Sequence, residues 1–194
     1  PFTYEKAREA WDRLHTMPKS ARTEAMIYDV GIIGNYLNHP IYYYIIEKMQ
    51  PVRPEEESDS GAYIERNIEN IIDLTLQFIK ENRSNLFKEI KENFAKDPNS
   101  ARLNSTIKSI AKAMSKDVGN ILNRQYENII LDTKREIEKN FNIKLRQNWL
   151  SVFVEEILMK YLTSRTDLHT GNLGVTSGGY LRYYEPAHPS SLSL

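Results

Sequence analysis

A long series of apolar residues at helical spacing, between positions 62 and 164, constrains the fold more than any other feature. Within each stripe the apolar residues mostly lie three or four positions apart, and the stripes begin at Ile64, Leu86, Leu103, Val118 and Trp149. About three apolar residues per two turns is typical of a helix with one face in a core. The pattern therefore predicts a mainly α protein, with a multi-helix bundle over residues 62–164.

The first 50 residues follow the same helical period and predict an N-terminal helical segment, 1–50. Thr3 is a candidate N-cap for a helix over 4–15. A second helix is predicted over about 21–38, and Pro40 can occupy the first turn of a short helix through Met49.

Two segments depart from the helical pattern. Residues 51–61 contain two prolines, four acids, two serines and a glycine, which predicts an acidic linker. Residues 165–194 contain four glycines within nine positions, and two β-prone runs flank Ser177-Gly178-Gly179. This pattern predicts a small C-terminal β-hairpin followed by an irregular tail.

Composition excludes several classes of function. The chain has 26 basic and 26 acidic residues in a length of 194 and contains no cysteine. A disulfide framework, a cysteine-ligated metal site and a thiol nucleophile are therefore excluded. The apolar runs are too short to span a bilayer, and no signal peptide is visible at the start. These observations predict a protein without membrane partners and with a cytoplasmic location (host cytoplasm or virion if the protein is viral).

Three oxygen-bearing side chains near the end of the chain are the candidates for chemistry. Asp167 and Asn172 share one short loop, and Glu185 follows the second β-prone run. Because a hairpin brings its ends together, we expect the three side chains to converge. Carboxylate and amide oxygens suit Mg²⁺, and one of the acids could instead accept a proton from an attacking hydroxyl.

The stretch Asp167-Leu168-His169-Thr170-Gly171-Asn172 resembles the catalytic loop of the protein-kinase-like superfamily. Its D-L-H-x-G-N form is most similar to the aminoglycoside-phosphotransferase-like and phage-encoded kinases, in which a metal-binding acid is often followed by proline, as Glu185 is by Pro186. The resemblance implies a divergent or degenerate kinase-like phosphotransferase that uses Mg²⁺ and ATP. It also implies Asp167 as catalytic base, His169 as a brace for the catalytic loop, and Asn172 and Glu185 as Mg²⁺ ligands.

The resemblance is local, from Asp167 to Pro186, and the sequence departs from the family elsewhere. It contains no Gly-rich phosphate loop and no strand with a V-A-I-K-type lysine. Gly31-Ile32-Ile33-Gly34 is only a glycine pair within a segment predicted as helix. Glu185 stands where the family has aspartate.

Other interpretations remain open. Asp and Asn on a glycine-containing loop often only form Asx turns and cap the backbone. His169, Glu185 and His188 could together bind Zn²⁺ or Mn²⁺, although no H-E-x-x-H spacing supports such a site. The main alternative is a non-enzymatic helical interaction or structural protein with a protein partner. For this role the tyrosine-rich run 41–46 is a candidate anchor, or else a helix wedged between others.

Nucleic-acid binding is a third option. Residues 101–148 carry a net charge of +5, whereas residues 51–100 carry −4. Lys108, Lys112 and Lys116 recur every four positions and so lie on one helix face. Such a strip can bind phosphates, but more often it is a solvated face.

Overall fold

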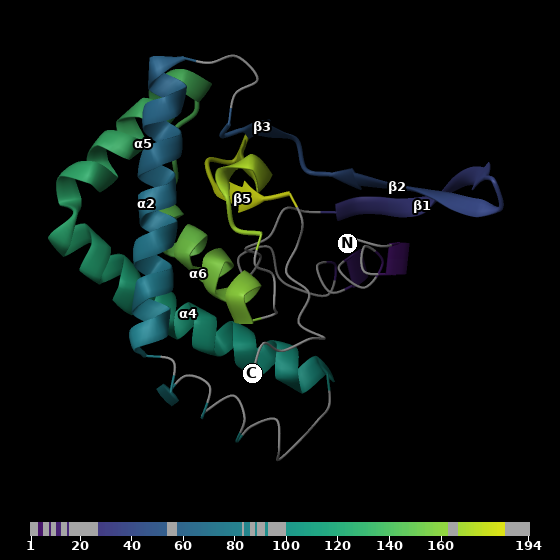
Figure 1. Ribbon diagram of the computed structural model, residues 1–194, viewed down its shortest axis with the longest axis horizontal. Coiled ribbons are helices and arrows are strands. Elements are labelled where there is room, and N and C mark those ends of the chain that lie inside the picture. The colour runs from purple at the N-terminus through teal and green to yellow at the C-terminus, as the bar shows by residue number, and fades with distance from the viewer. Residues whose placement is uncertain are drawn as a thin grey trace.

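The computed structural model contains helices around one core and two small antiparallel sheets (Figure 1). It describes residues 27–53, 58–82, 100–162 and 167–184, with single residues within 4–15 and 84–92. The helices of these stretches are α2 (Asp59–Glu81), α4 (Ser100–Gln125), α5 (Glu127–Phe141), α6 (Trp149–Leu162) and the short 3₁₀ helix η2 (Thr170–Asn172). The strands are β1 (Ile27–Tyr36), β2 (His39–Ile46), β3 (Met49–Pro51), β4 (Leu173–Thr176) and β5 (Leu181–Tyr183). The mainly α prediction is confirmed, and no helix of the described stretches is long and apolar enough to cross a bilayer.

The apolar stripes of the sequence form the core. In α2 the stripe beginning at Ile64 is buried through Ile68, Ile71 and Ile79. Thr75 interrupts the stripe but is buried too, because its hydroxyl donates to the carbonyl of Ile71 at 2.8 Å. Helix α4 packs mainly against α6, and α2 against α5.

Helix α6 is buried on most of its surface because helices cover one side and a sheet another. Phe153 and Ile157 are fully buried, and β5 packs directly on this helix. The strand residues Leu173, Leu181 and Tyr183 belong to the same core as the helices. The sheet is therefore part of the helical core, and the loop before β4 is held against that core.

The sheet under the candidate loop joins distant parts of the chain in the order β3-β4-β5. The two predicted β-prone runs coincide with β4 and β5, but β3 adds a third strand, with Pro51 opposite Gly174. The ends of the predicted linker 51–61 are consequently ordered parts of the fold. Val52 is buried and donates its N–H to the carbonyl of Leu173 at 2.9 Å, and the hydroxyl of Ser58 caps α2 by accepting from the N–H of Gly61. Residues 54–57 lie outside the described part of the chain.

The predicted helices over 21–38 and 40–49 are wrong from Ile27 onward, because this stretch forms the antiparallel strands β1 and β2. Apolar runs this short do not distinguish a strand from a helix by period alone. The β-branched and aromatic residues favour the strand, and Pro40 lies at the start of β2, opposite Asn35. At the N-terminus, the residues described between 4 and 15 are helical, whereas Thr3 lies outside the described residues.

Gly179, in the turn between β4 and β5, gives a prediction about stability. Its φ is +86°, and an added Cβ would lie 2.4 Å from the carbonyl oxygen of Lys144. We expect Gly179→Ala to lower the free energy of unfolding by about 2 kcal/mol or more, through backbone strain and steric overlap. Urea unfolding followed by circular dichroism measures the change.

Gly178→Ala is the matched control, because the nearest atom to its added Cβ is 3.7 Å away. We expect a change within about 0.5 kcal/mol. Equal losses in the two variants would contradict this account of the turn.

Candidate functional site

The candidate loop connects the region after α6 to β4 and contains the short helix η2. His169 is the N-cap of η2, and its Nδ1 accepts a hydrogen bond from the N–H of Gly171 at 3.1 Å. A Cβ on residue 171 would lie 2.8 Å from that same nitrogen. The glycine of the motif is therefore required for the imidazole to fold back over the loop.

The imidazole of His169 also contacts the carboxylate of Asp167. Nε2 lies 2.6 Å from Oδ1 of Asp167. Because Nδ1 is an acceptor, the neutral ring carries its proton on Nε2 and donates it to Asp167. Both ring nitrogens are thus engaged, so His169 holds the carboxylate in place and has no nitrogen available for a substrate proton.

Asn172 ends η2, and its side chain contacts the backbone of Asp167 and the ring of His169. Its Nδ2 donates to the backbone carbonyl of Asp167 at 3.3 Å. Nδ2 also lies 3.3 Å from Nε2 of His169, but in this tautomer both nitrogens are donors and the contact is not a hydrogen bond. The amide is oriented by its nitrogen, which leaves Oδ1 available to accept a hydrogen bond or bind a cation.

Side chains from α2 anchor the loop through Thr170. The buried hydroxyl of Thr170 lies 3.1 Å from Glu65 Oε1 and 3.3 Å from Glu69 Oε1, and it donates to these carboxylates. Glu65 also forms an ion pair with Arg53, at 3.4 Å. A hydrogen bond to a carboxylate is stronger than one between neutral groups, so this contact fixes η2 against α2.

Strand β5 anchors the loop from the other side through Tyr183. Its hydroxyl donates to the carbonyl of Leu168 at 2.7 Å, and its N–H donates to Glu156 Oε1 at 2.8 Å. Burial, and to a smaller extent the charge of Glu156, raises the pKa of Tyr183 well above its ordinary value. The next residue, Tyr184, donates its N–H to the carbonyl of Asn172 at 2.9 Å.

The structure thus brings together two of the three side chains that were expected to converge, Asp167 and Asn172, and His169 contacts both residues. Asp167, His169 and Asn172 lie in mutual contact, whereas Glu185 and His188 lie outside the described residues. Among the described residues, no group of three or more His, Cys, Asp or Glu side chains could hold a metal ion. The oxygens of Asp167 and Asn172 are hard donors and fit Mg²⁺ chemically, as a partial ligand set.

The anchors of the loop could not be found from the sequence. Glu65 and Glu69 are four positions apart and so share a face of α2, but about a hundred residues separate them from Thr170. Tyr183 was predicted only as part of a β-prone run. No local pattern indicates that these side chains meet at the loop.

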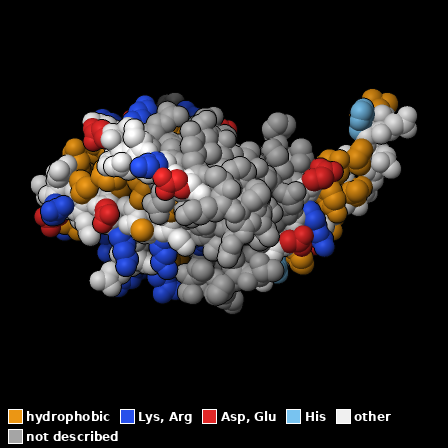
Figure 2. Space-filling view, turned by 90° about the horizontal axis from the view of Figure 1, so that it is seen from below, with side chains coloured by type: hydrophobic (Ala, Val, Ile, Leu, Met, Phe, Trp, Pro, Cys, Tyr) orange, Lys and Arg blue, Asp and Glu red, His pale blue; other side chains and the backbone are white. Residues whose placement is uncertain are grey.

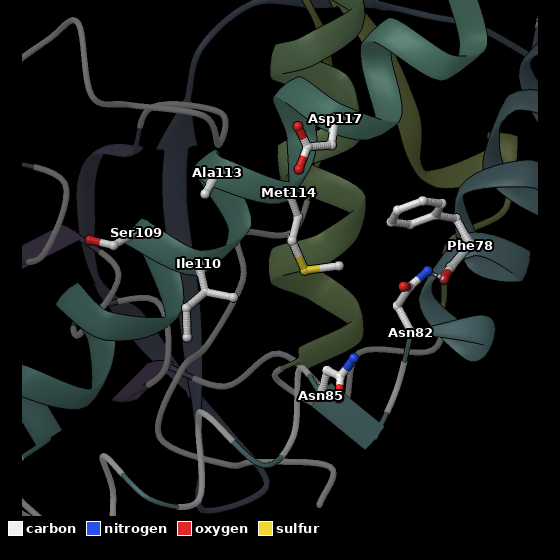
Figure 3. A pocket seen from close by; sticks show the side chains of 8 residues that line it. All are labelled: Phe78, Asn82, Asn85, Ser109, Ile110, Ala113, Met114 and Asp117. Atoms are coloured by element: carbon white, nitrogen blue, oxygen red, sulfur yellow. Dashed lines mark hydrogen bonds between the residues drawn. The ribbon is translucent and has the colours of Figure 1, made fainter.

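A separate pocket of about 370 Å³ lies between α2 and α4 (Figure 3). Phe78, Ile110 and Met114 give it apolar walls, and Asn82 and Asp117 lie at its edge. Phe78 lies nine or more positions along α2 from the glutamates that bind Thr170. At a rise of 1.5 Å per residue, this separation is roughly 14 Å or more along the helix. The pocket is therefore not part of the candidate loop.

The predicted basic strip lies on α4. Lys112 and Lys116 are exposed, whereas Lys108 is half-buried and has an interaction partner. Tyr126, one of the two aromatic residues within 101–148, is partly buried and packs against the core. Nucleic-acid binding through this strip stays a prediction.

Comparison of the chain with protein-family models, with curated proteins and with solved structures gave no match.

The raised pKa of Tyr183 gives a prediction about pH. The folded chain keeps this phenol protonated at pH values where the unfolded chain, with an ordinary pKa of about 10, releases the proton. Stability from this group is therefore complete below pH 10 and is lost as the pH rises towards the folded-state pKa, at up to about 1.4 kcal/mol per pH unit. Urea unfolding measured from about pH 8 to about pH 11, a range that spans the ordinary tyrosine pKa, should show this decline in the free energy of unfolding.

Tyr183→Phe should make that decline shallower, although Tyr43 and Tyr184 also have raised pKa values and will leave part of it. At pH 7 the variant loses the bond to Leu168, which costs about 1–2 kcal/mol. Tyr161→Phe is the control, because it also removes a phenol hydroxyl, from a half-buried position on α6. An alkaline decline unchanged in Tyr183→Phe would contradict the assignment.

Proposed function

We propose that the chain is a divergent, kinase-like phosphotransferase that uses Mg²⁺ and ATP, with the loop 167–172 as its catalytic loop. The observation that carries the proposal is the joint geometry of Asp167 and Asn172. Asn172 is oriented by the backbone of Asp167, and a carboxylate and an amide oxygen are thereby presented from one anchored loop. These are the groups needed to orient an acceptor hydroxyl and to bind a magnesium ion.

In this proposal Asp167 accepts the proton of the acceptor hydroxyl. Its carboxylate is about two-thirds exposed, so a substrate can reach it. The bond from His169 Nε2 occupies Oδ1 and leaves Oδ2 for the hydroxyl. His169 is a positioning residue, because it sets the orientation of the carboxylate without contacting the substrate.

Asn172 Oδ1 and Glu185 would hold Mg²⁺, which neutralises charge on the phosphates of the nucleotide. Tyr184, which immediately precedes Glu185, is bonded through its N–H to the carbonyl of Asn172. This bond supports the pairing of the two ligands in the proposal, since Glu185 is the next residue along the chain.

The segment before α2 favours the enzyme over a purely helical interaction protein. Strands β1, β2 and β3 precede the helices, and β3 pairs with the strand that follows the loop. A β-containing N-terminal part is expected of a kinase-like chain, although a strand lysine aimed at Asp167 is not identified in the sequence. The proposed enzyme is divergent in this respect.

A non-enzymatic interaction protein is the second candidate, and one observation favours it. Nine large apolar side chains are exposed along β1, β2 and their turn. An apolar surface of this extent on one element typically marks an interaction site. The two candidates are compatible, because the exposed side chains lie outside the loop.

The experiment measures phosphoryl transfer and nucleotide binding in the same preparation. We expect isothermal titration calorimetry to detect Mg-ATP binding, and radiolabelled ATP to give transfer to an acceptor or slow hydrolysis. Asp167→Asn should reduce turnover by roughly 10²–10⁴-fold while Mg-ATP binding persists, because only proton acceptance is removed. Asn172→Ala should weaken binding and raise the Mg²⁺ concentration needed for turnover.

Asp117→Asn is the matched control, since this exposed carboxylate on α4 borders the separate pocket. It should leave both measurements unchanged. Absence of Mg-ATP binding in the wild-type chain, or equal activity in wild type and Asp167→Asn, would contradict the proposal.

A further inference from the structure

Strands β1 and β2 and the turn between them form an arm, residues 27–46, that extends away from the helices (Figure 1). Leu37 and Asn38 make the turn, and both have positive φ, as a tight two-residue hairpin turn requires. The two strands form a sheet of their own, and among the described residues β2 pairs with β1 alone. A two-stranded hairpin is at best marginally stable in water, so a partner on its edge or face would stabilise it.

The arm is unusually apolar for an exposed element. Large exposed apolar side chains follow it from base to tip, as Figure 2 also shows, and they are Tyr28, Ile32, Ile33, Tyr36, Leu37, Ile41, Tyr42, Tyr44 and Ile45. No Asp, Glu, Lys or Arg occurs between residues 30 and 46. Edge strands normally carry such charges to prevent pairing with another chain. The arm lacks this protection.

Four of the nine exposed side chains lie on β2 beside its outer edge, and they are Ile41, Tyr42, Tyr44 and Ile45. They are between 41% and 53% exposed. Pairing along this edge would form backbone hydrogen bonds, and these side chains would add apolar cross-strand contacts on both sides of the sheet.

Residues near the N-terminus already contact the arm. The ring of Tyr4 stacks on Tyr42 with centroids 5.3 Å apart, and the indole N–H of Trp11 donates to the carbonyl of Tyr28. On the other face Tyr43 lies across Gly31, where a Cβ would be 2.6 Å from the ring, and its hydroxyl donates to Asp29. These contacts hold the arm's side chains in place, and in the described part of the chain the outer edge of β2 has no pairing strand.

The sequence of β2 identifies the partner for that edge. Ile41-Tyr42-Tyr43-Tyr44-Ile45 reads the same in both directions. In an antiparallel pair of two copies centred on Tyr43, Ile41 therefore lies opposite Ile45 of the second copy, and Tyr42 opposite Tyr44. In this register the odd-numbered residues of one copy lie opposite odd-numbered residues of the other, and even-numbered residues opposite even-numbered ones. The backbone N–H groups that point out from the edge of one β2 therefore face the C=O groups that point out from the edge of the other.

We propose that the chain forms a two-fold symmetric dimer through the edge of β2, giving one four-stranded antiparallel sheet in the order β1-β2-β2-β1. Identical apolar pairs on both sides of the axis make the surface self-complementary, as a two-fold interface requires. The absence of charge lets the two edges approach without repulsion. The dimer does not depend on the phosphotransferase proposal, because no residue of the loop takes part.

The absence of cysteine from the chain makes a direct test of this register simple. Tyr43 lies on the proposed axis, so Tyr43→Cys should form a disulfide between two full-length chains under mild oxidation. Ile41→Cys is the matched control. Its two copies would lie four residues from one another along paired strands, about 13 Å, which is too far for a disulfide. A mixture of Ile41→Cys and Ile45→Cys chains should cross-link again, because these positions face each other.

Charge substitution tests the same register without a covalent bond. By analytical ultracentrifugation at about 10–100 µM, we expect the wild-type chain to be a dimer. Ile41→Lys/Ile45→Lys and Ile41→Glu/Ile45→Glu should each dimerise at least about tenfold more weakly, because like charges lie opposite. An equimolar mixture of the two should recover dimers, whereas Ile33→Lys on β1 should behave as wild type.

A wild-type chain that stays monomeric over this range overturns the proposal, and it would mean that another polypeptide covers the arm. Cross-linking of Ile41→Cys alone as efficiently as the mixed pair overturns the register. Loss of dimer in Ile33→Lys, or failure of the mixed charge variants to recover dimers while circular dichroism shows both folded, overturns pairing through β2.

Discussion

The buried side chain of Tyr183 connects the helical core, the three-stranded sheet and the candidate loop. Its N–H is bonded to Glu156 on α6, and its hydroxyl to the carbonyl of Leu168 in the loop. Its ring packs near Phe153, and the ammonium group of Lys160 lies 4.9 Å from the ring centroid. Burial of the phenol hydroxyl and of Oε1 of Glu156 is tolerable because each has a hydrogen-bond partner. The position of Asp167 thus depends on the packing of α6 against β5.

The loop is rigid on one side and open on the other. Thr170 is fixed to two carboxylates of α2, and Asn172 to the end of β5, whereas the carboxylate of Asp167 faces solvent. A reactive group on a fixed support with an open approach is the arrangement that chemistry on an external substrate requires. The arm is joined to the same sheet, since β3 follows β2 after two residues and pairs with β4. An interaction surface and the candidate loop are therefore connected through one short strand.

The sequence predicted those parts of the fold whose pattern is local and long. The stripe of α2 and the apolar positions of α6 repeat over several turns, which is enough for the helical period to be unambiguous. The arm was predicted as helix because its apolar runs are short, its bulged strand shifts register twice, and its turn uses Leu37-Asn38 without a glycine. The density of β-branched and aromatic residues with Gly31 and Gly34 was the available signal. The candidate loop was predicted from the order of its residues in the sequence. The contacts that support it, from α2 and β5, are long-range and have no local sequence pattern.

The central claim, that the loop 167–172 binds Mg-nucleotide for phosphoryl transfer, is tested most directly by a crystal structure with Mg²⁺ and a non-hydrolysable ATP analogue. The account predicts a magnesium ion at about 2.0–2.1 Å from Oδ1 of Asn172, with the terminal phosphate facing the carboxylate of Asp167. A nucleotide bound in the pocket between α2 and α4, or a loop that keeps neither metal nor phosphate at saturating concentration, would contradict it.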